Sequence, residues 1–174
     1  SAVPDLTILN VDAPTEAISG QSFSVSWTVR NNGADTGNRA WYDAVYLSLD
    51  QIFDRNADIY LGFVDHVGGL ATGQSYTQTQ SFSIPTGLSG PFYVFVASDS
   101  GNSIYERANE TNNSGYDGRS MLVTLAPPAD LVVGTITIPA NGVPGQNATI
   151  SYTVENRGAN AALGSWYDSI YISA

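Results

Sequence analysis

The chain has 174 residues, contains no cysteine and no lysine, and carries a formal charge of -10. The absence of cysteine excludes disulfides, thiol nucleophiles and cysteine-based zinc sites. Sixteen carboxylates against six arginines exclude the clusters of cations that nucleic acid or an anionic membrane surface requires. With 43% apolar and 13% charged residues, the chain is able to build a packed core.

Apolar residues recur at every second position along most of the chain, which is the spacing of half-buried β-strands. Residues 22–29 show this spacing most clearly, with Phe23, Val25 and Trp27 on one face and serine or threonine on the other. Residues 92–97 are apolar on both faces and are expected in the centre of a sheet. In chain order, the predicted strands are 5–12, 22–29, 41–49, 58–66, 76–84, 92–97 and 119–126.

The segments between these strands are rich in glycine, asparagine and proline, as in Asn31-Asn32-Gly33 and Pro85-Thr86-Gly87. Such residues form the tight turns of antiparallel sheets. Residues 104–111 have the only helical tendency, and we expect them to be too polar and too short to contribute to the core. Seven short strands joined by turns predict an all-β protein with an immunoglobulin-like, seven-stranded antiparallel β-sandwich.

The sequence contains an internal repeat. Residues 4–49 align without gaps with residues 129–174 at an offset of 125, and 16 of the 46 pairs are identical. Unrelated sequences of this length would share roughly three residues. The strongest block is Trp41-Tyr42-Asp43, which returns as Trp166-Tyr167-Asp168. The chain is therefore predicted to be a tandem repeat whose second unit is incomplete.

The predicted domain boundaries follow from this repeat. We expect a β-sandwich at residues 1–126, a stiff spacer at residues 127–128, which are both proline, and the N-terminal part of a second unit at residues 129–174. The three strands of that part would bury too little apolar surface to stand alone, and they would leave open edges. The chain is therefore expected to be a fragment of a longer array, or to have its half-domain completed by another copy through strand exchange.

Several short motifs occur in an order that resembles one known family. They are Pro4-Asp5-Leu6, the Gly20-Gln21 turn before residues 25–31, Val45-Tyr46-Leu47-Ser48, and Ile104-Tyr105-Glu106 followed by residues 109–113. These motifs resemble the CARDB domain, the cell-adhesion-related domain found in bacteria, over residues 4 to about 125 and again, incompletely, from residue 129. The resemblance implies an Ig-like β-sandwich of the kind found in tandem arrays of large secreted or surface proteins, with adhesive or structural roles. It supplies no catalytic motif.

The chain offers little catalytic chemistry. His66 is the only histidine, and without cysteine it cannot complete a catalytic triad or a common zinc site, so we interpret it as an ordinary residue at a strand end. The carboxylate pairs Asp43 with Asp58 and Glu106 with Glu110 have the residue types that glycosidases use. Asp43 recurs within an aromatic block of the second copy, which favours a scaffold role. We therefore predict no catalytic residue, and we expect that the protein is not an enzyme.

An acidic loop follows the third predicted strand. Asp50, Asp54, Asn56 and Asp58 place oxygen atoms at intervals that resemble the opening of a calcium loop. The pattern departs from such a loop because no glycine follows at the turn, no glutamate closes the loop, and Arg55 introduces a positive charge. These four residues are candidate calcium ligands, and a solvated hairpin loop is the alternative interpretation.

A second acidic loop precedes the last predicted strand. Glu106, Glu110, Asn112 and Asn113 form a secondary set of candidate calcium ligands. The alternative is that these side chains hold the turn in place through hydrogen bonds to the backbone. Calcium is the only cofactor that the sequence suggests.

Two adjacent aromatic residues are candidates for ligand binding. Trp41 and Tyr42 lie next to each other in a predicted strand, so their side chains point to opposite faces and one of them is expected to be exposed. An exposed Tyr42 would offer a small platform for stacking on a sugar. An ordinary pair of one core and one surface residue is the alternative.

Composition, repeat and resemblance together predict a non-enzymatic structural or adhesive module from a tandem array in a secreted or cell-surface bacterial or archaeal protein, with calcium as its candidate stabiliser. The alternative is a carbohydrate- or ligand-binding accessory module of a large extracellular enzyme. The expected partners are neighbouring repeats, a second copy that completes the half-domain, and a surface glycan or protein. Nucleic acid is not expected, and no run of about 18 apolar residues predicts insertion into a membrane. The expected location is extracellular or at the cell surface.

Overall fold

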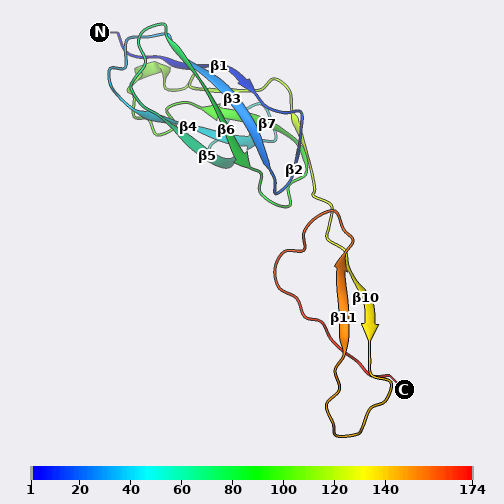
Figure 1. Ribbon diagram of the computed structural model, residues 1–174. Coiled ribbons are helices and arrows are strands. Elements are labelled where there is room, and N and C mark those ends of the chain that lie inside the picture. Colours follow the sequence, from blue (N-terminus) through cyan, green and yellow to red (C-terminus); the bar gives the residue numbers. More distant parts are fainter. Residues whose placement is uncertain (1, 174) are drawn as a thin grey trace. The chain divides into compact units, whose positions relative to one another are not determined.

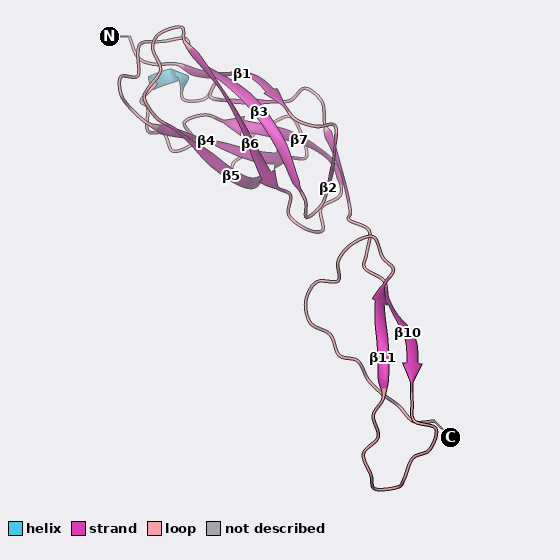
Figure 2. Ribbon diagram, in the orientation of Figure 1, coloured by secondary structure: helices cyan, strands magenta, loops and turns pink. Residues whose placement is uncertain are grey.

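The computed structural model describes residues 2–173 and divides the chain into two compact units, Ser1–Leu125 and Ala126–Ala174. The first unit contains two β-sheets, and the second contains a two-stranded hairpin (Figure 1). Apart from one 3₁₀ turn, η1 (Arg107–Asn109), the regular elements of the described residues are strands, as Figure 2 shows. The prediction of an all-β protein is confirmed.

The smaller sheet of the first unit has the order β1-β3-β6 and is antiparallel throughout. Its strands are β1 (Leu6–Asp12), β3 (Ser22–Asn31) and β6 (Ser75–Ser83). In β3, buried residues alternate with more exposed ones, so the period of two in the sequence correctly predicted one face toward a core and one toward solvent. The serines and threonines of that outer face are paired across the strands, for example Thr28 with Thr77.

The larger sheet has the order β2-β9-β7-β4-β5, and β8 also pairs with β7. Its strands are β2 (Glu16–Ile18), β9 (Met121–Thr124), β7 (Gly90–Ala97), β4 (Trp41–Ser48), β5 (Ile59–His66) and β8 (Ser114–Tyr116). The central position of β7 agrees with its apolar sequence. Residues 2–125 therefore contain nine strands rather than the seven predicted. The two additional strands are β2, which pairs in parallel with β9, and β8.

The hydrophobic core lies between the two sheets and is centred on Trp27, whose side chain is fully buried. Leu6, Val25, Leu47 and Val96 belong to the same cluster, and each of them is almost completely buried. Burial of a side chain of this size contributes on the order of 2 kcal/mol. The two packed sheets form the predicted Ig-like β-sandwich.

The segment at residues 104–111 corrects one expectation. Ile104 is fully buried in the main cluster, and Glu106 is fully buried as well, so this polar segment does contribute to the interior. The 3₁₀ turn itself has no buried residue. Sequence periodicity could not identify these two positions because the segment is irregular and its buried residues follow neither a strand nor a helix period.

A second, smaller cluster covers the outer face of the larger sheet. Tyr46 and Phe95 are buried there on the side of the sheet away from Trp27. Phe53 of the 50–58 loop packs on both rings, with centroid separations of 5.0 Å to Tyr46 and 5.8 Å to Phe95. The acidic loop is therefore anchored by an aromatic side chain, which explains why residues 92–97 are apolar on both faces.

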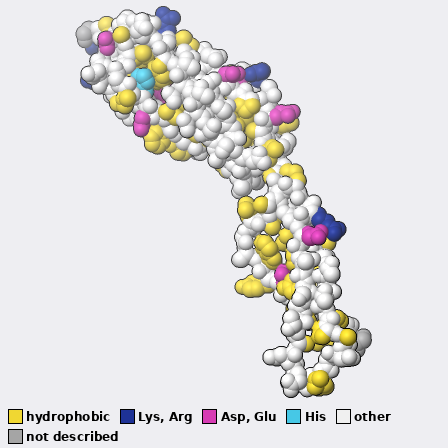
Figure 3. All heavy atoms as spheres, in the orientation of Figure 1, with side chains coloured by type: hydrophobic (Ala, Val, Ile, Leu, Met, Phe, Trp, Pro, Cys, Tyr) yellow, Lys and Arg dark blue, Asp and Glu magenta, His cyan; other side chains and the backbone are white. Residues whose placement is uncertain are grey.

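The second unit has two strands, β10 (Leu131–Thr137) and β11 (Ser151–Asn156), which pair in antiparallel register. A third strand at the block beginning with Trp166 was predicted, and it is not formed among residues 165–173. Apolar side chains of this unit are exposed, including Ile136 at 60% and Tyr171 at 87%, and Figure 3 shows hydrophobic side chains at its surface. The physical reason is that residues 126–173 contain no second sheet against which a third strand could pack.

The β1–β3 pair of the first unit and the β10–β11 pair of the second, together called the two hairpins below, share one register. Leu6 pairs with Asn31 in the first unit, and Leu131 pairs with Asn156 in the second, each pair separated from the other by 125 positions. Beyond an irregularity in β1 and in β10, Val11 lies opposite Trp27 and Ile136 lies opposite Tyr152. Strand residues that are 125 positions apart in the sequence therefore have equivalent pairing partners.

Candidate functional site

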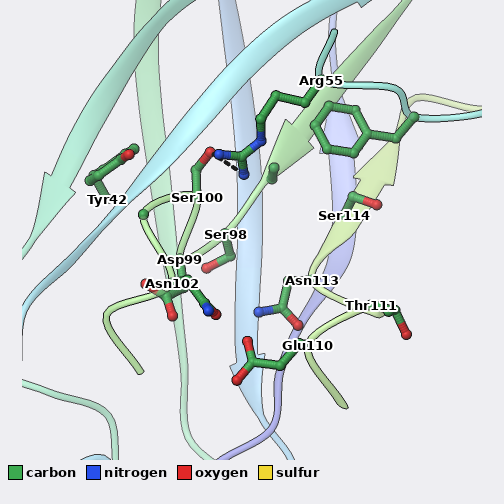
Figure 4. A pocket seen from close by; sticks show the side chains of 13 residues that line it. Tyr42, Arg55, Ser98, Asp99, Ser100, Asn102, Glu110, Thr111, Asn113 and Ser114 are labelled. Atoms are coloured by element: carbon green, nitrogen blue, oxygen red, sulfur yellow. Dashed lines mark hydrogen bonds between the residues drawn. The ribbon is translucent and has the colours of Figure 1, made fainter. Parts of the chain in front are cut away.

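A polar pocket of about 830 Å³ lies on the outer side of the larger sheet. Its walls come from Tyr42 of β4, Phe53 and Arg55 of the 50–58 loop, and the segments 97–102 and 110–114 (Figure 4). The last two segments follow β7 and precede β8, which the pairing of β7 with β8 brings together. Loops at the ends of packed strands are the usual place for a binding site on a β-sandwich.

The segment after β7 is held in an unusual conformation by the carboxylate of Asp99. Its two oxygens accept the backbone N–H groups of Ser103 and Ile104, each at 2.8 Å. Asp99 and Asn102 both have left-handed backbone conformations, with φ of 45° and 55°. Such conformations are strained in residues other than glycine, and the two hydrogen bonds help to hold them. Burial raises the pKa of Asp99, although its two backbone donors oppose this shift.

Glu106 is bonded to two residues that line the pocket, Glu110 and Asn113, and is fully buried. Its Oε2 accepts the backbone N–H of Leu6 at 3.1 Å, and its Oε1 accepts Nδ2 of Asn113 at 3.3 Å. Burial raises the pKa of Glu106 to about 7, and the nearby carboxylates of Glu110 and Asp99 act in the same direction. The residue therefore connects β1 to the loop before β8 and loses its proton near neutral pH.

The other residues of the second acidic loop also act as ties. Oε1 of Glu110 accepts the backbone N–H of Glu106 at 2.6 Å, and Nδ2 of Asn112 donates to Oδ1 of Asp5 at 2.9 Å. Glu106, Glu110 and Asn113 do come together, and Glu110 and Asn113 line the pocket. These hydrogen bonds agree with the interpretation that the side chains hold the turn before β8 in place.

The carboxylates of the 50–58 loop form local turns. Oδ1 of Asp50 accepts the N–H of Ile52 at 2.8 Å, Oδ1 of Asp54 accepts the N–H of Asn56 at 2.9 Å, and Oδ2 of Asp58 accepts the N–H of Asp54 at 2.8 Å. These are the bonds by which Asp stabilises a turn. Among residues 2–173, no three Asp, Glu or His side chains form a group that could hold a metal ion.

Asp43 is buried at the centre of a hydrogen-bond network rather than in a cleft. It accepts Nε1 of Trp27, the hydroxyl of Tyr76 and the hydroxyl of Ser98, each at 2.7 Å. Burial raises the pKa of Asp43, and the three donors and the nearby His66 oppose this shift. Burial and the adjacent Asp43 raise the pKa of Tyr76. Asp43 thus has the scaffold role that its recurrence favoured, and its hydrogen-bond partners are side chains.

The two aromatic candidates have different environments. Trp41 is buried, donates through Nε1 to the hydroxyl of Tyr76 at 3.0 Å, and packs against His66 with a centroid separation of 4.4 Å. His66 also stacks on Tyr76 at 3.9 Å, so it is part of an aromatic stack at the end of β5. Tyr42 is partly exposed and lines the pocket. Of the two residues, Tyr42 is the one that a ligand can reach.

Sequence reasoning missed the segment that contributes most to the pocket, Ser98-Asp99-Ser100-Gly101-Asn102. A signal was present, because a run of small and turn-forming residues directly after an apolar central strand marks a loop at a sheet end. The hydrogen bond from Nη2 of Arg55 to Oγ of Ser100, at 3.1 Å, could not be predicted because it joins residues 45 positions apart.

The fold and the pocket define an Ig-like β-sandwich module whose buried carboxylates organise loops. The family model for CARDB matches residues 3–116, and the chain belongs to the CARDB family. This is a family of non-catalytic domains, and membership supports an adhesion-like module rather than an enzyme. A comparison with curated proteins gave no match.

Solved structures of low sequence identity resemble this chain. The crystal structure of a CARDB domain from Pyrococcus furiosus, in complex with di-metal ions, is 17% identical, with a TM-score of 0.49, and the match covers 70% of this chain and 90% of that one. The solution structure of the same Pyrococcus furiosus domain is 18% identical, with a TM-score of 0.47 and coverages of 70% and 95%. A β-glucosidase from Listeria innocua in complex with laminaribiose is 16% identical, with a TM-score of 0.45, and only 16% of that chain is covered against 70% of this one.

Over the described part of the chain, no helix has the length and the apolar character that are needed to cross a membrane.

Proposed function

We propose that this chain is a non-enzymatic structural or adhesive segment of a tandem array of CARDB units in a secreted or cell-surface protein. The observation that carries this proposal is the shared register of the two hairpins. The pairs Val11 with Trp27 and Ile136 with Tyr152 occupy equivalent places at an offset of 125 residues. A hairpin with the same pairing, the same bulged region and a related sequence is what the beginning of a second unit would form.

Polar contacts around the two hairpins support the same interpretation. Oδ1 of Asn31 accepts the N–H groups of Asp5 and Gly33, and Oδ1 of Asn156 accepts those of Asp130 and Gly158, all four at 3.0 Å. In the second unit, the hydroxyl of Tyr152 donates to Oδ2 of Asp168 at 3.2 Å, which is the counterpart of the bond from Trp27 to Asp43. The second unit therefore keeps the asparagine hydrogen bonds that hold the loop after β3 in the first unit.

The composition supports a location outside the cell. A chain without cysteine has no unpaired thiol at risk in an oxidising medium, and a charge of -10 favours solubility. In intact cells of the source organism, external proteinase should degrade the protein. Degradation only after lysis would contradict this part of the proposal.

The scaffold role of the buried carboxylates supports a module without catalysis. Both oxygens of Asp43 are bonded to donors within the core, and both oxygens of Glu106 hold segments of the chain together. Purified protein should therefore leave panels of glycosides and peptides unchanged over long incubations. Turnover at an ordinary enzymatic rate, lost in a variant of a pocket carboxylate, would overturn the proposal.

Calcium stabilisation stays a prediction for the 50–58 loop. Asp50, Asp54 and Asp58 each use one carboxylate oxygen to accept a backbone N–H, which fixes the loop without a metal ion. A ligand that binds only the native state raises the melting temperature. A melting temperature that is equal in millimolar calcium and in a chelator would show that calcium does not stabilise the module.

A further inference from the structure

The pocket between the 50–58 loop and the segments 97–102 and 110–114 contains a buried polar atom that has no partner. Asn113 is only 8% exposed, and its Oδ1 accepts no hydrogen bond in the structure. Its Nδ2 donates to Oε1 of Glu106, which fixes the orientation of the amide, so Oδ1 is directed away from Glu106. A buried acceptor without a donor is unfavourable, and this oxygen has almost no accessible surface, so a small turn of the Asn113 side chain is needed for a group in the pocket to donate to it.

Further acceptor and donor groups line the same pocket. Figure 4 shows the side chains of Glu110 and Asn113 close to each other on one side of the pocket, and Arg55 reaching toward Ser100. Glu110 accepts the N–H of Glu106 through Oε1, which directs its carboxylate. The pocket therefore presents both acceptors and a guanidinium donor. A hydroxyl group, which both donates and accepts, matches this arrangement.

One wall of the pocket is aromatic. The ring of Tyr42 lies so close to Gly101 that a Cβ there would come within 2.6 Å of it, so only glycine allows this approach. Phe53 lines the pocket as well and is held on the sheet by Tyr46 and Phe95. Aromatic side chains beside a few convergent polar groups are typical of sites for small organic ligands with one apolar face.

The walls are held in place before any ligand binds. Asp99 bonds to the backbone at Ser103 and Ile104, and Arg55 bonds to Ser100 at 3.1 Å. Loops that are already ordered lose less conformational entropy when a ligand binds, which favours affinity.

The arrangement does not favour a hard cation. Both oxygens of Asp99 are occupied by backbone donors, and the positive charge of Arg55 lies at the same pocket. A calcium ion requires six to eight oxygen ligands. A neutral ligand with several hydroxyl groups has no such requirement, and it supplies the donor that Oδ1 of Asn113 lacks.

We propose that this pocket binds a saccharide, with hydroxyl groups donating to Asn113 and Glu110, a hydroxyl oxygen accepting from Arg55, and a sugar face lying against Tyr42. The volume of about 830 Å³ exceeds that of a single pyranose ring and suits a short oligosaccharide or the end of a longer glycan. This proposal does not depend on the tandem array, because all of the residues belong to the first unit.

The test begins with the intact chain on a glycan array, followed by titration of the highest-affinity oligosaccharide into ¹⁵N-labelled protein. The backbone amides of residues 98–102 and 110–114 should shift on titration, while those of β10 and β11 should not. An array without a hit, or a hit that shifts amides elsewhere, overturns the proposal. Shifts of these amides with calcium chloride and with no saccharide would show a metal site instead and would also overturn it.

Two variants at the pocket and one control make the test specific. Arg55→Gln should weaken saccharide binding by about tenfold or more, because a charged hydrogen bond is lost. Glu110→Gln retains an oxygen for the N–H of Glu106 and should weaken binding by about fivefold. Arg30→Gln removes the same charge from the exposed side of β3 and should leave the affinity unchanged. Equal affinities for all three variants would contradict the assigned residues even if a saccharide binds.

Discussion

The two units use related residues at equivalent positions, and only the first unit buries them. Trp27 is fully buried, whereas its counterpart Tyr152 is 39% exposed. Val45 is fully buried and its counterpart Ile170 is 57% exposed. The pairing of the hairpin strands is nevertheless the same in both units.

This comparison separates two levels of folding. Strand pairing and the loop that Asn31 or Asn156 closes depend on neighbouring residues of the hairpin, so they form in both units. Burial depends on a second sheet, which in the first unit is supplied by strands such as β7 and β9. An isolated two-stranded hairpin is marginally stable in water, so the second unit should contribute little to the stability of the chain.

The largest expected difference between the units concerns the central aromatic residue. Trp27→Ala should lower the free energy of unfolding by about 4 kcal/mol, because it opens a cavity and removes a donor to the buried Asp43. Tyr152→Ala should change it by less than about 0.5 kcal/mol. Urea unfolding followed by circular dichroism would measure both. Similar losses of unfolding free energy for the two variants would contradict the inferred difference between the units.

A smaller difference is expected at the asparagine that closes each loop. The side chain of Asn31 is fully buried and bonds to Asp5, Gly33, Ala34 and Leu70. Asn31→Ala should therefore cost about 3 kcal/mol, since several buried backbone groups lose their partner.

The matched change in the second unit is Asn156→Ala. Asn156 is exposed, so water can replace its bonds to Asp130 and Gly158, and the cost should be below about 1 kcal/mol. Urea denaturation of both variants gives the two values. A larger loss for Asn156→Ala than for Asn31→Ala would show that the second unit is the more cooperative one.

The effect of pH on the free energy of unfolding should be confined to the first unit. It is the smallest of the three differences between the units that we predict. Burial raises the pKa of Glu106 from 4.5 to about 7, so the unfolded chain releases this proton at a lower pH than the folded chain does. The contribution to stability is therefore complete below pH 4.5 and is lost as the pH rises through 7. Between pH 5 and pH 8 the free energy of unfolding should fall by roughly 2 kcal/mol from this group.

Glu106→Gln is the control for this pH dependence. The glutamine keeps an oxygen that can accept the N–H of Leu6 but does not titrate, so stability should vary less between pH 5 and pH 8. Melting temperatures of both proteins across this range would decide the matter. The same fall in the variant would assign the effect to other carboxylates, such as Asp43 or Asp99, whose pKa values are also raised.

The sequence predicted the parts of the fold that carry their own periodicity. Strands such as β3 and β6 alternate regularly, and the apolar run of β7 correctly placed it in the centre of its sheet. The strands β2 and β8 were missed because each has three residues and is defined by pairing with a distant partner. No local pattern of that length distinguishes a strand from a turn.

The sequence identified single residues of the candidate site but not their grouping in one pocket. Tyr42, Glu110 and Asn113 were each identified from residue type, but for separate reasons and in separate sites. Their meeting in one pocket depends on the pairing of β7 with β8 and on the left-handed backbone at Asp99. These are tertiary features that the spacing of residues along the chain does not encode.

We propose above that residues 129–174 begin a second CARDB unit. The most direct test is to add the counterpart of residues 50–125 after this segment. A chain in which a copy of residues 50–125 follows Ala174 should form a second sandwich. Hydrogen exchange of the Ser151–Asn156 amides, measured by NMR, should then become as slow as that of the Ser22–Asn31 amides. Exchange that stays as fast as in the present chain, in an extended chain whose first unit is intact, would contradict the claim.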